Sequence, residues 1–159
     1  MSLPKSITTI ALTGAIAISA LALTANAEGH GANPAVAARQ GHMQVMSLNL
    51  GILGNMARGN TEYDADIAQA AADNLVTMGA VNQRFYWPEG TDSESIEGTR
   101  ALPAIWEDQA SLMEIAMRYG PAAEGLSAAA GQGLDAMRAA IGPLGAVCGD
   151  CHESFQEER

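Results

Sequence analysis

Apolar residues recur at intervals of three and four along most of the chain after residue 33, which is the spacing of one face of an α-helix. The first such segment predicts a helix from Pro34 to about Arg58. Asn33 is a favoured N-cap, proline suits the first turn, and Gly59 suits the position after the last turn. The apolar face of this helix is expected to carry Val36, Met43, Met46, Leu50, Leu53 and Met56.

Three more helices are predicted downstream. The second covers residues 64–85, and a loop rich in Gly, Ser, Thr and Pro, longer than most connections, follows at 86–103. The third runs from about Pro103 to Ala130, with a kink or short break at residues 120–121, and the fourth from about Gln132 to 156, with a kink at residues 142–143. The apolar faces of the second and third helices are expected to include Ile67, Ala71, Leu75, Met78, Val81, Ile105, Leu112, Ile115 and Met117.

Four helices joined by two short turns and one longer loop predict an all-α, antiparallel, up-down-up-down four-helix bundle. The composition agrees, since aromatic residues make up only 4% of the chain, alanine is abundant, and no β-branched run occurs after residue 27. A length of 159 residues suits one such domain.

The first 27 residues have a different character. Lys5 is followed by an apolar run from Ile7 to about Leu23 and then by Ala-Asn-Ala at 25–27, which predicts a secretory signal peptide cleaved after Ala27. A membrane anchor is the less favoured interpretation, because Thr, Gly and Ser interrupt the run and small residues end it. The expected domain organisation is therefore a signal peptide at 1–27 and a bundle at 28–159, located in the periplasm with no membrane attachment after cleavage.

The net charge of the chain limits the kinds of partner that it can bind. The formal net charge is -10, and cleavage would remove Lys5, the only lysine, leaving seven arginines against 18 acidic residues. Such a surface excludes nucleic acid and anionic lipid as partners. A charged docking partner would be basic.

Both cysteines and a histidine lie within five positions, at Cys148, Cys151 and His152. On a helix this spacing places all three on one face, so both thiols can add to one porphyrin while the imidazole binds its iron. The motif therefore predicts one covalently attached haem c per chain. A disulfide would close almost no loop, a redox dithiol lacks its βαβ context, and a zinc site would need His42 or His30 to complete it.

With this motif in its last helix, the chain resembles the cytochrome c' and cytochrome c-556 family of four-helix-bundle haem proteins. The resemblance rests on "CGDCHESF" near the C-terminus, "ARQGHM" in the first helix and "GTRALPAIWED" before the third. It implies that Cys148 and Cys151 form the thioethers, that His152 is the proximal iron ligand, and that Arg39 and Gln40 lie close to the haem propionates.

The resemblance also implies that Met43, four residues after the arginine, faces the distal side of the iron. Relatives with leucine, phenylalanine or tyrosine there are five-coordinate and bind nitric oxide or carbon monoxide. A methionine there, as in c-556-like members, supplies a sixth ligand suited to electron transfer. His42 lies about 100° around the helix, cannot face the iron together with Met43, and is expected to be a surface histidine or one with its hydrogen bonds satisfied.

We therefore expect an electron-carrying cytochrome with redox partner proteins and no enzymatic activity, because no acid–base constellation is evident. The alternative is a five-coordinate protein that binds a small gas ligand. Relatives also form antiparallel homodimers through the first two helices, where Gly51 and Gly54 would allow close approach. One departure from the family is Gln156, which stands where relatives often have a basic residue.

Overall fold

The computed structural model describes residues 33–158. It contains the helices α1 (Pro34–Arg58), α2 (Ala65–Gly79), α3 (Ala104–Glu107), α4 (Gln109–Ala130) and α5 (Leu134–Phe155). The predicted all-α class and four-helix bundle are confirmed, with α3 as one additional turn before α4. The predicted signal peptide lies outside the described residues. Within residues 33–158, no helix has the length and apolar character needed to cross a membrane.

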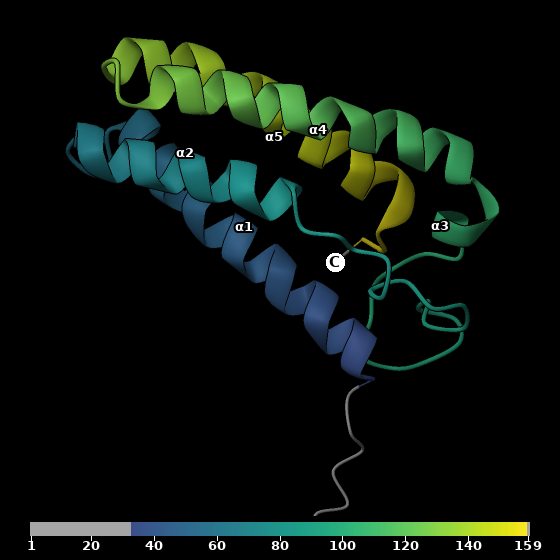
Figure 1. The fold of residues 1–159 in the computed structure, drawn as a ribbon. Coiled ribbons are helices and arrows are strands. Elements are labelled where there is room, and N and C mark those ends of the chain that lie inside the picture. The colour runs from purple at the N-terminus through teal and green to yellow at the C-terminus, as the bar shows by residue number, and fades with distance from the viewer. Residues whose placement is uncertain (1–32, 159) are drawn as a thin grey trace, which may run out of the picture.

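The four long helices pack as neighbours in the pairs α1 with α2, α2 with α4, α4 with α5, and α1 with α5. Toward its N-terminal end, α1 leans away from α4 and α5 (Figure 1). The long connection between α2 and α3 and the C-terminal residues after α5 lie at this end of the bundle (Figure 1). One end of the bundle therefore carries the short α1–α2 and α4–α5 turns, and the other carries the long loop.

The ends of α1 follow the predicted capping signals. The side-chain oxygen of Asn33 accepts hydrogen bonds from the amides of Ala35 and Val36, at 3.0 and 3.4 Å. At the other end Gly59 adopts a φ of 75°, a left-handed conformation that glycine reaches without a steric cost.

The prediction that the second helix continues to Phe85 is wrong, because α2 ends at Gly79. The side-chain oxygen of Asn82 accepts a hydrogen bond from the amide of Arg84 at 3.0 Å, a local turn that competes with a helix. The guanidinium of Arg39 then holds the carbonyl oxygen of Tyr86 at 3.2 Å. A contact from a distant part of the chain thus redirects the backbone after α2.

The third predicted helix is divided at Asp108, whose φ of -119° and ψ of 62° are not helical. The Asp108 carboxylate accepts a hydrogen bond from the amide of Ser111 and so caps α4. The short break considered at residues 120–121 does not occur, since α4 continues through Pro121, and α5 likewise continues through Pro143. The kinks at the two prolines stay predictions. Both prolines are exposed, so water can serve the carbonyl groups that they leave without an amide partner.

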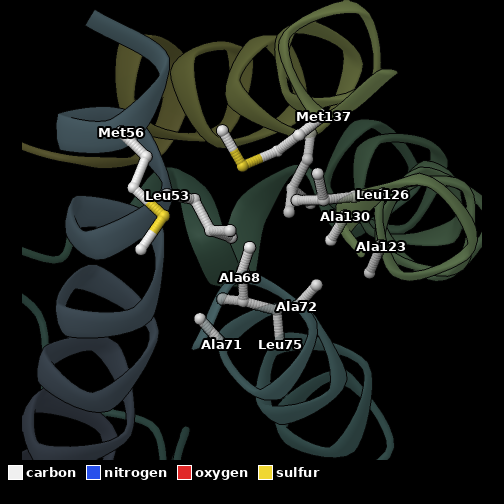
Figure 2. Close-up of a cluster of buried hydrophobic side chains, with 11 residues drawn as sticks. Leu53, Met56, Ala68, Ala71, Ala72, Leu75, Ala123, Leu126, Ala130 and Met137 are labelled. Atoms are coloured by element: carbon white, nitrogen blue, oxygen red, sulfur yellow. The ribbon is translucent and has the colours of Figure 1, made fainter. Parts of the chain in front are cut away.

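The hydrophobic core fills the end of the bundle that carries the two short turns. Figure 2 shows Leu53 of α1 pointing between α2, α4 and α5 toward Leu126 and Met137. Several predicted core positions differ, because Ile67 is 50%, Met43 39% and Met117 72% exposed. The buried cluster consists of Leu53, Met56, Ala68, Ala71, Ala72, Leu75, Ala123, Leu126, Ala130, Met137 and Leu144.

Candidate haem site

The three motif residues lie on the last three turns of α5. Met137, Leu144 and Cys151 recur at intervals of seven, or two helical turns, so the motif continues the face that carries the core residues. Cys148 and Cys151 are half-buried and His152 is exposed. The side chains thus share one helix face, beyond the end of the hydrophobic cluster.

The two thiols are free in this structure. Burial raises the pKa of Cys148 and, together with the neighbouring Cys148, that of Cys151. Burial, with a smaller contribution from Cys148, also raises the pKa of Tyr119 to about 12. Thiols that stay protonated differ from those of dithiol redox sites, whose reactivity depends on a depressed pKa.

The register between α1 and α5 places Met43 level with His152. The Nε of Arg138 on α5 donates a 2.7 Å hydrogen bond to the carbonyl oxygen of Ala57 on α1, and the two helices run in opposite directions (Figure 1). Met43 lies 14 residues before Ala57 and His152 lies 14 residues after Arg138, about 21 Å along either helix.

Met43 also shares a face of α1 with two residues that pack against the hydrophobic cluster. Met43, Leu50 and Ala57 recur every seven residues, and Ala57 packs against the core cluster. Leu50 packs against the core cluster, whereas the side chain of Met43 is 39% exposed. A partly exposed methionine side chain, level with an imidazole on the opposing helix, suits a group inserted between the two helices.

His42 is directed elsewhere, and the expectation of a surface or hydrogen-bonded histidine is wrong. Its side chain is 4% exposed, and neither ring nitrogen has a hydrogen-bond partner among the described residues. The ring packs edge-to-face against Tyr86 with a centroid distance of 5.6 Å. Burial lowers the pKa of His42, which favours the neutral imidazole.

Arg39 is 3% exposed and holds the long loop. Its guanidinium donates to the carbonyl oxygens of Tyr86 (3.2 Å) and Thr91 (2.5 Å) and to the hydroxyls of Thr91 (2.8 Å) and Thr99 (2.6 Å). It also lies 4.8 Å from the centre of the Trp87 ring. Burial lowers the pKa of Arg39, and the charge of Asp92 partly offsets this effect.

Gln40 extends the same attachment, because its Nε2 donates to the carbonyl oxygen of Gly98 at 2.6 Å. The predicted contacts of Arg39 and Gln40 with the haem propionates stay predictions. Sequence reasoning did not identify Thr91 and Thr99 as the acceptors for Arg39. Loop residues have no hydrophobic periodicity by which the sequence could identify them. The need for these hydroxyls as hydrogen-bond acceptors becomes evident only from the burial of the Arg39 guanidinium in the structure.

Residues 100–102 pair with the chain that follows α5. The amide of Leu102 donates to the carbonyl oxygen of Phe155 at 3.0 Å, and the amide of Glu157 donates to the carbonyl oxygen of Arg100 at 2.8 Å. Ala101 and Gln156 form an antiparallel bridge between these bonds. The Arg100 guanidinium also donates to the carbonyl oxygen of Glu157.

The residues present fit haem c better than the alternatives. Two half-buried thiols and an imidazole share one helix face, and a thioether lies level with the imidazole on the facing helix. Within residues 33–158, no three His, Cys, Asp or Glu side chains come together as a metal-binding group. The donor set thus lacks the further ligands that a structural zinc ion requires.

The comparison with known families decides between these chemistries. The family model described as "Cytochrome C'" matches residues 34–156, which include all five helices. The chain belongs to the cytochrome c' family. The family implies haem c, and Cys148, Cys151 and His152 are this cytochrome's residues with the matching CxxCH spacing.

Two relatives come from Cereibacter sphaeroides. A cytochrome c' is 35% identical over 143 residues, covering 90% of this chain and 93% of the relative. A cytochrome c-554 is 38% identical over 120 residues, covering 76% of this chain and 78% of the relative. The cytochrome is thus similar to relatives that carry two different names within the family.

Solved structures agree with this assignment. A cytochrome c' from Rhodobacter sphaeroides superimposes with a TM-score of 0.77 at 35% identity, covering 79% of this chain and 97% of the other. A variant from Alcaligenes xylosoxidans, solved in the ferrous state with bound NO, gives a TM-score of 0.66 at 32% identity, covering 79% and 94%. A third cytochrome c', described as having ligand-controlled dimer dissociation, gives 0.71 at 25% identity, covering 79% and 95%.

Proposed function

We propose that this cytochrome carries single electrons on one covalently bound haem, with His152 as the proximal iron ligand and Met43 as the distal ligand. Cys148 and Cys151 would form the thioethers. When bound, the haem supplies a one-electron redox centre, and a thioether opposite an imidazole raises its reduction potential.

The level position of Met43 and His152 on facing helices carries this proposal. The Arg138–Ala57 hydrogen bond fixes the register of α1 against α5, and the side chain of Met43 is partly exposed. His42 does not compete for this role, because its ring nitrogens are enclosed by protein.

Optical and electron paramagnetic resonance spectra of the purified haem-loaded protein test the distal assignment. We expect a low-spin ferric spectrum, and Met43→Ala is expected to convert it to a high-spin spectrum. Met46→Ala is the matched control, because Met46 lies on the next turn of α1 but packs against the hydrophobic cluster. A high-spin wild-type spectrum, or a Met43→Ala protein that stays low-spin, would overturn methionine ligation.

Binding of a small gas is the second candidate function. Two variants of a cytochrome c' from Alcaligenes xylosoxidans were solved with a gas bound, one with NO and the other with carbon monoxide. In this proposal Met43 is the ligand that a gas would have to displace from the distal side of the iron. A thioether is weak enough as a ligand to be displaced. Carbon monoxide titration of the ferrous protein separates the functions, since Met43 ligation predicts weaker binding in wild type than in Met43→Ala.

We further propose a homodimer formed through α1 and α2. Large apolar side chains on the two helices are uncovered, with Val45 43%, Leu48 64% and Ile67 50% exposed. Gly51 is exposed among them, whereas Gly54 is buried against its own Arg58 and contributes no free surface. In sedimentation velocity the wild-type protein is expected to be a dimer and Leu48→Glu a monomer. A Leu48→Glu protein that is still a dimer would refute this interface.

The proposed location is the periplasm, supported by the signal-like first 27 residues and by the family. The excess of acidic residues points to redox partner proteins with a basic docking surface. N-terminal sequencing of the periplasmic fraction is expected to give Glu28 as the first residue. A chain that starts at Met1 and sediments with membranes would contradict cleavage.

A further inference from the structure

We propose that residues 98–102 form a strap that fixes the distance between α1 and α5 at the haem site. Two neighbouring side chains are its positioning residues: Thr99 attaches the strap to α1, and Arg100 attaches it to the end of α5. This inference rests on the proposed ligation by Met43. The strap begins one turn from Met43 and ends one turn from His152, so it spans the two sides of the site.

The α1 end of the strap is fastened by side chains. Gln40 donates to the carbonyl oxygen of Gly98 at 2.6 Å, and Arg39 donates to the hydroxyl of Thr99 at 2.6 Å. Arg39 lies four residues before Met43, on the same side of α1. Thr99 is 8% and Arg39 is 3% exposed, so water cannot readily replace their hydrogen bond.

The α5 end is fastened mainly by backbone. Leu102 and Arg100 pair with Phe155 and Glu157 through bonds of 3.0 and 2.8 Å, and the Arg100 guanidinium adds a bond to the Glu157 carbonyl oxygen. The amide of Gln156 in turn donates to the carbonyl oxygen of His152 at 3.1 Å. The Arg100 guanidinium also places a positive charge at the C-terminal end of the α5 dipole.

The strap matters because the buried cluster that holds α1 and α5 together lies toward the opposite end, with Met46 and Leu50 packed at its edge. There Leu53 packs in one cluster with Met137 and Leu144. Toward the haem site α1 leans away from α5, as Figure 1 shows, and no member of the cluster lies in residues 34–52 or 145–158. A helix anchored at one end can swing at the other, and the strap limits that swing.

The chemical consequence concerns the sixth ligand. A thioether is a weak ligand, so a small outward movement of α1 is enough to replace six-coordinate by five-coordinate iron. An intact strap favours the Met43-ligated form, and a severed strap favours the form open to an added gas. The loop residues, which touch neither predicted ligand, would thus select between the two functions considered above.

A matched pair of variants in the haem-loaded protein tests the strap. Thr99→Val keeps the shape of the side chain and removes the hydroxyl, whereas Thr99→Ser keeps the hydroxyl. We expect Thr99→Val to gain high-spin character and to bind carbon monoxide about tenfold more tightly in the ferrous state, equivalent to about 1.4 kcal/mol. Thr99→Ser is expected to match wild type. Arg100→Ala is expected to shift the spin state and the carbon monoxide affinity in the same direction as Thr99→Val but by less, because the backbone bonds at the α5 end remain.

The Met43→Ala background separates the strap from the ligation on which it depends. There the strap variants are expected to leave the spin state and carbon monoxide affinity unchanged, because the residue through which they act is gone. If Met43→Ala alters the spectrum but Thr99→Val and Arg100→Ala do not, the strap inference fails and ligation survives. If Met43→Ala itself changes nothing, ligation fails and the strap inference fails with it.

Two further results would overturn the strap alone. One is a Thr99→Val effect that persists in Met43→Ala, and the other is a Thr99→Ser effect as large as that of Thr99→Val. Thermal unfolding of each variant checks that the bundle is intact at the temperature of measurement. Should Thr99→Val not fold, Arg100→Ala decides, since most of the far attachment is backbone and survives the change.

Discussion

The ring of Tyr119 on α4 occupies the space where a side chain at Gly79 would stand. A Cβ atom on Gly79 would lie 2.8 Å from Cδ1 of Tyr119, whose hydroxyl is held by the carbonyl oxygen of Leu75 at 2.9 Å. Gly79→Ala is therefore expected to destabilise the protein by about 1–3 kcal/mol, the usual cost of overpacking. Urea unfolding of the haem-loaded protein measures this difference.

The control for this change is Gly125→Ala on α4. No atom lies within 4 Å of a Cβ placed on Gly125, which is exposed within the helix. Alanine there is expected to stabilise by about 0.5–1 kcal/mol, because glycine is a poor helix former. Two substitutions with effects of the same sign would show that the Tyr119 contact does not decide the outcome.

Arg138 is expected to stabilise the end of α1. The carbonyl oxygen of Ala57 lies in the last turn, where intrahelical donors run out, and Arg138 satisfies it. Arg138→Met keeps most of the side-chain length without the donor and is expected to cost about 1 kcal/mol in urea unfolding. Asp135→Asn, which removes only the 3.7 Å exposed ion pair with Arg138, is expected to cost less than about 0.5 kcal/mol.

Two buried polar residues on the same face of α1 are expected to respond in opposite ways to replacement by leucine. His42 has no hydrogen-bond partner, so His42→Leu removes an unsatisfied group and is expected to raise stability by about 1 kcal/mol. Asn49, seven residues later, donates to the carbonyl oxygen of Val45 at 2.8 Å and accepts from Asn74 at 3.0 Å. Asn49→Leu is expected to cost about 1–3 kcal/mol, because Asn74 then loses its partner.

The His42→Leu variant also tests whether His42 contacts the cofactor. If His42→Leu instead lowers the haem content or shifts the absorption spectrum, then His42 interacts with the haem or its ligand. That result would contradict the assignment of His42 as a packing residue beside Tyr86.

Acid stability is expected to depend on Asp73. Hydrogen bonds from Ser127 and then from Gln69, at 2.6 and 2.8 Å, hold the pKa of Asp73 below its ordinary value of 3.8. A carboxylate with a depressed pKa contributes stability that is complete above 3.8 and is lost as the pH falls through its folded-state value. The contribution is expected to be below about 1 kcal/mol, because the pair is exposed.

Ser127→Ala removes the larger of these two hydrogen bonds. The variant is expected to be less stable than wild type at neutral pH and equally stable once Asp73 is protonated in both proteins. Urea unfolding across this pH range gives the two curves. A stability difference that stays constant down to the acid limit would assign the effect to packing of Ser127 rather than to the charge of Asp73.

Local sequence signals predicted the elements whose structure depends on near neighbours. Asn33 and Gly59 mark the ends of α1, and Cys148, Cys151 and His152 share a helix face as their spacing requires. The end of α2 was not predictable in this way. Residues up to Phe85 keep a helical pattern, but Arg39, some 47 residues away, holds the carbonyl oxygen of Tyr86.

Burial was harder to predict than helix formation. Ile67 fits a periodic apolar face of α2, yet the core uses the small side chains of Ala68, Ala71 and Ala72. Small residues let α2 approach its neighbours closely. A prediction based on hydrophobicity favours large apolar side chains such as Ile67 and therefore does not identify alanines as core residues. The strap was missed for a related reason, because its contacts depend on loop backbone and on two threonines with no periodic neighbours.

The one-sided position of the hydrophobic cluster has a consequence for how the molecule matures. The cluster draws on the second half of α1 and the first half of α5, so helical packing there does not require the last three turns that carry the cysteines. If the chain is exported as proposed, this half is expected to assemble before the proposed thioethers form, with both thiols on an ordered scaffold. In the haem-loaded cytochrome the porphyrin would add apolar contacts between α1 and α5 at the other end, so its removal is expected to loosen that end while the cluster keeps its packing.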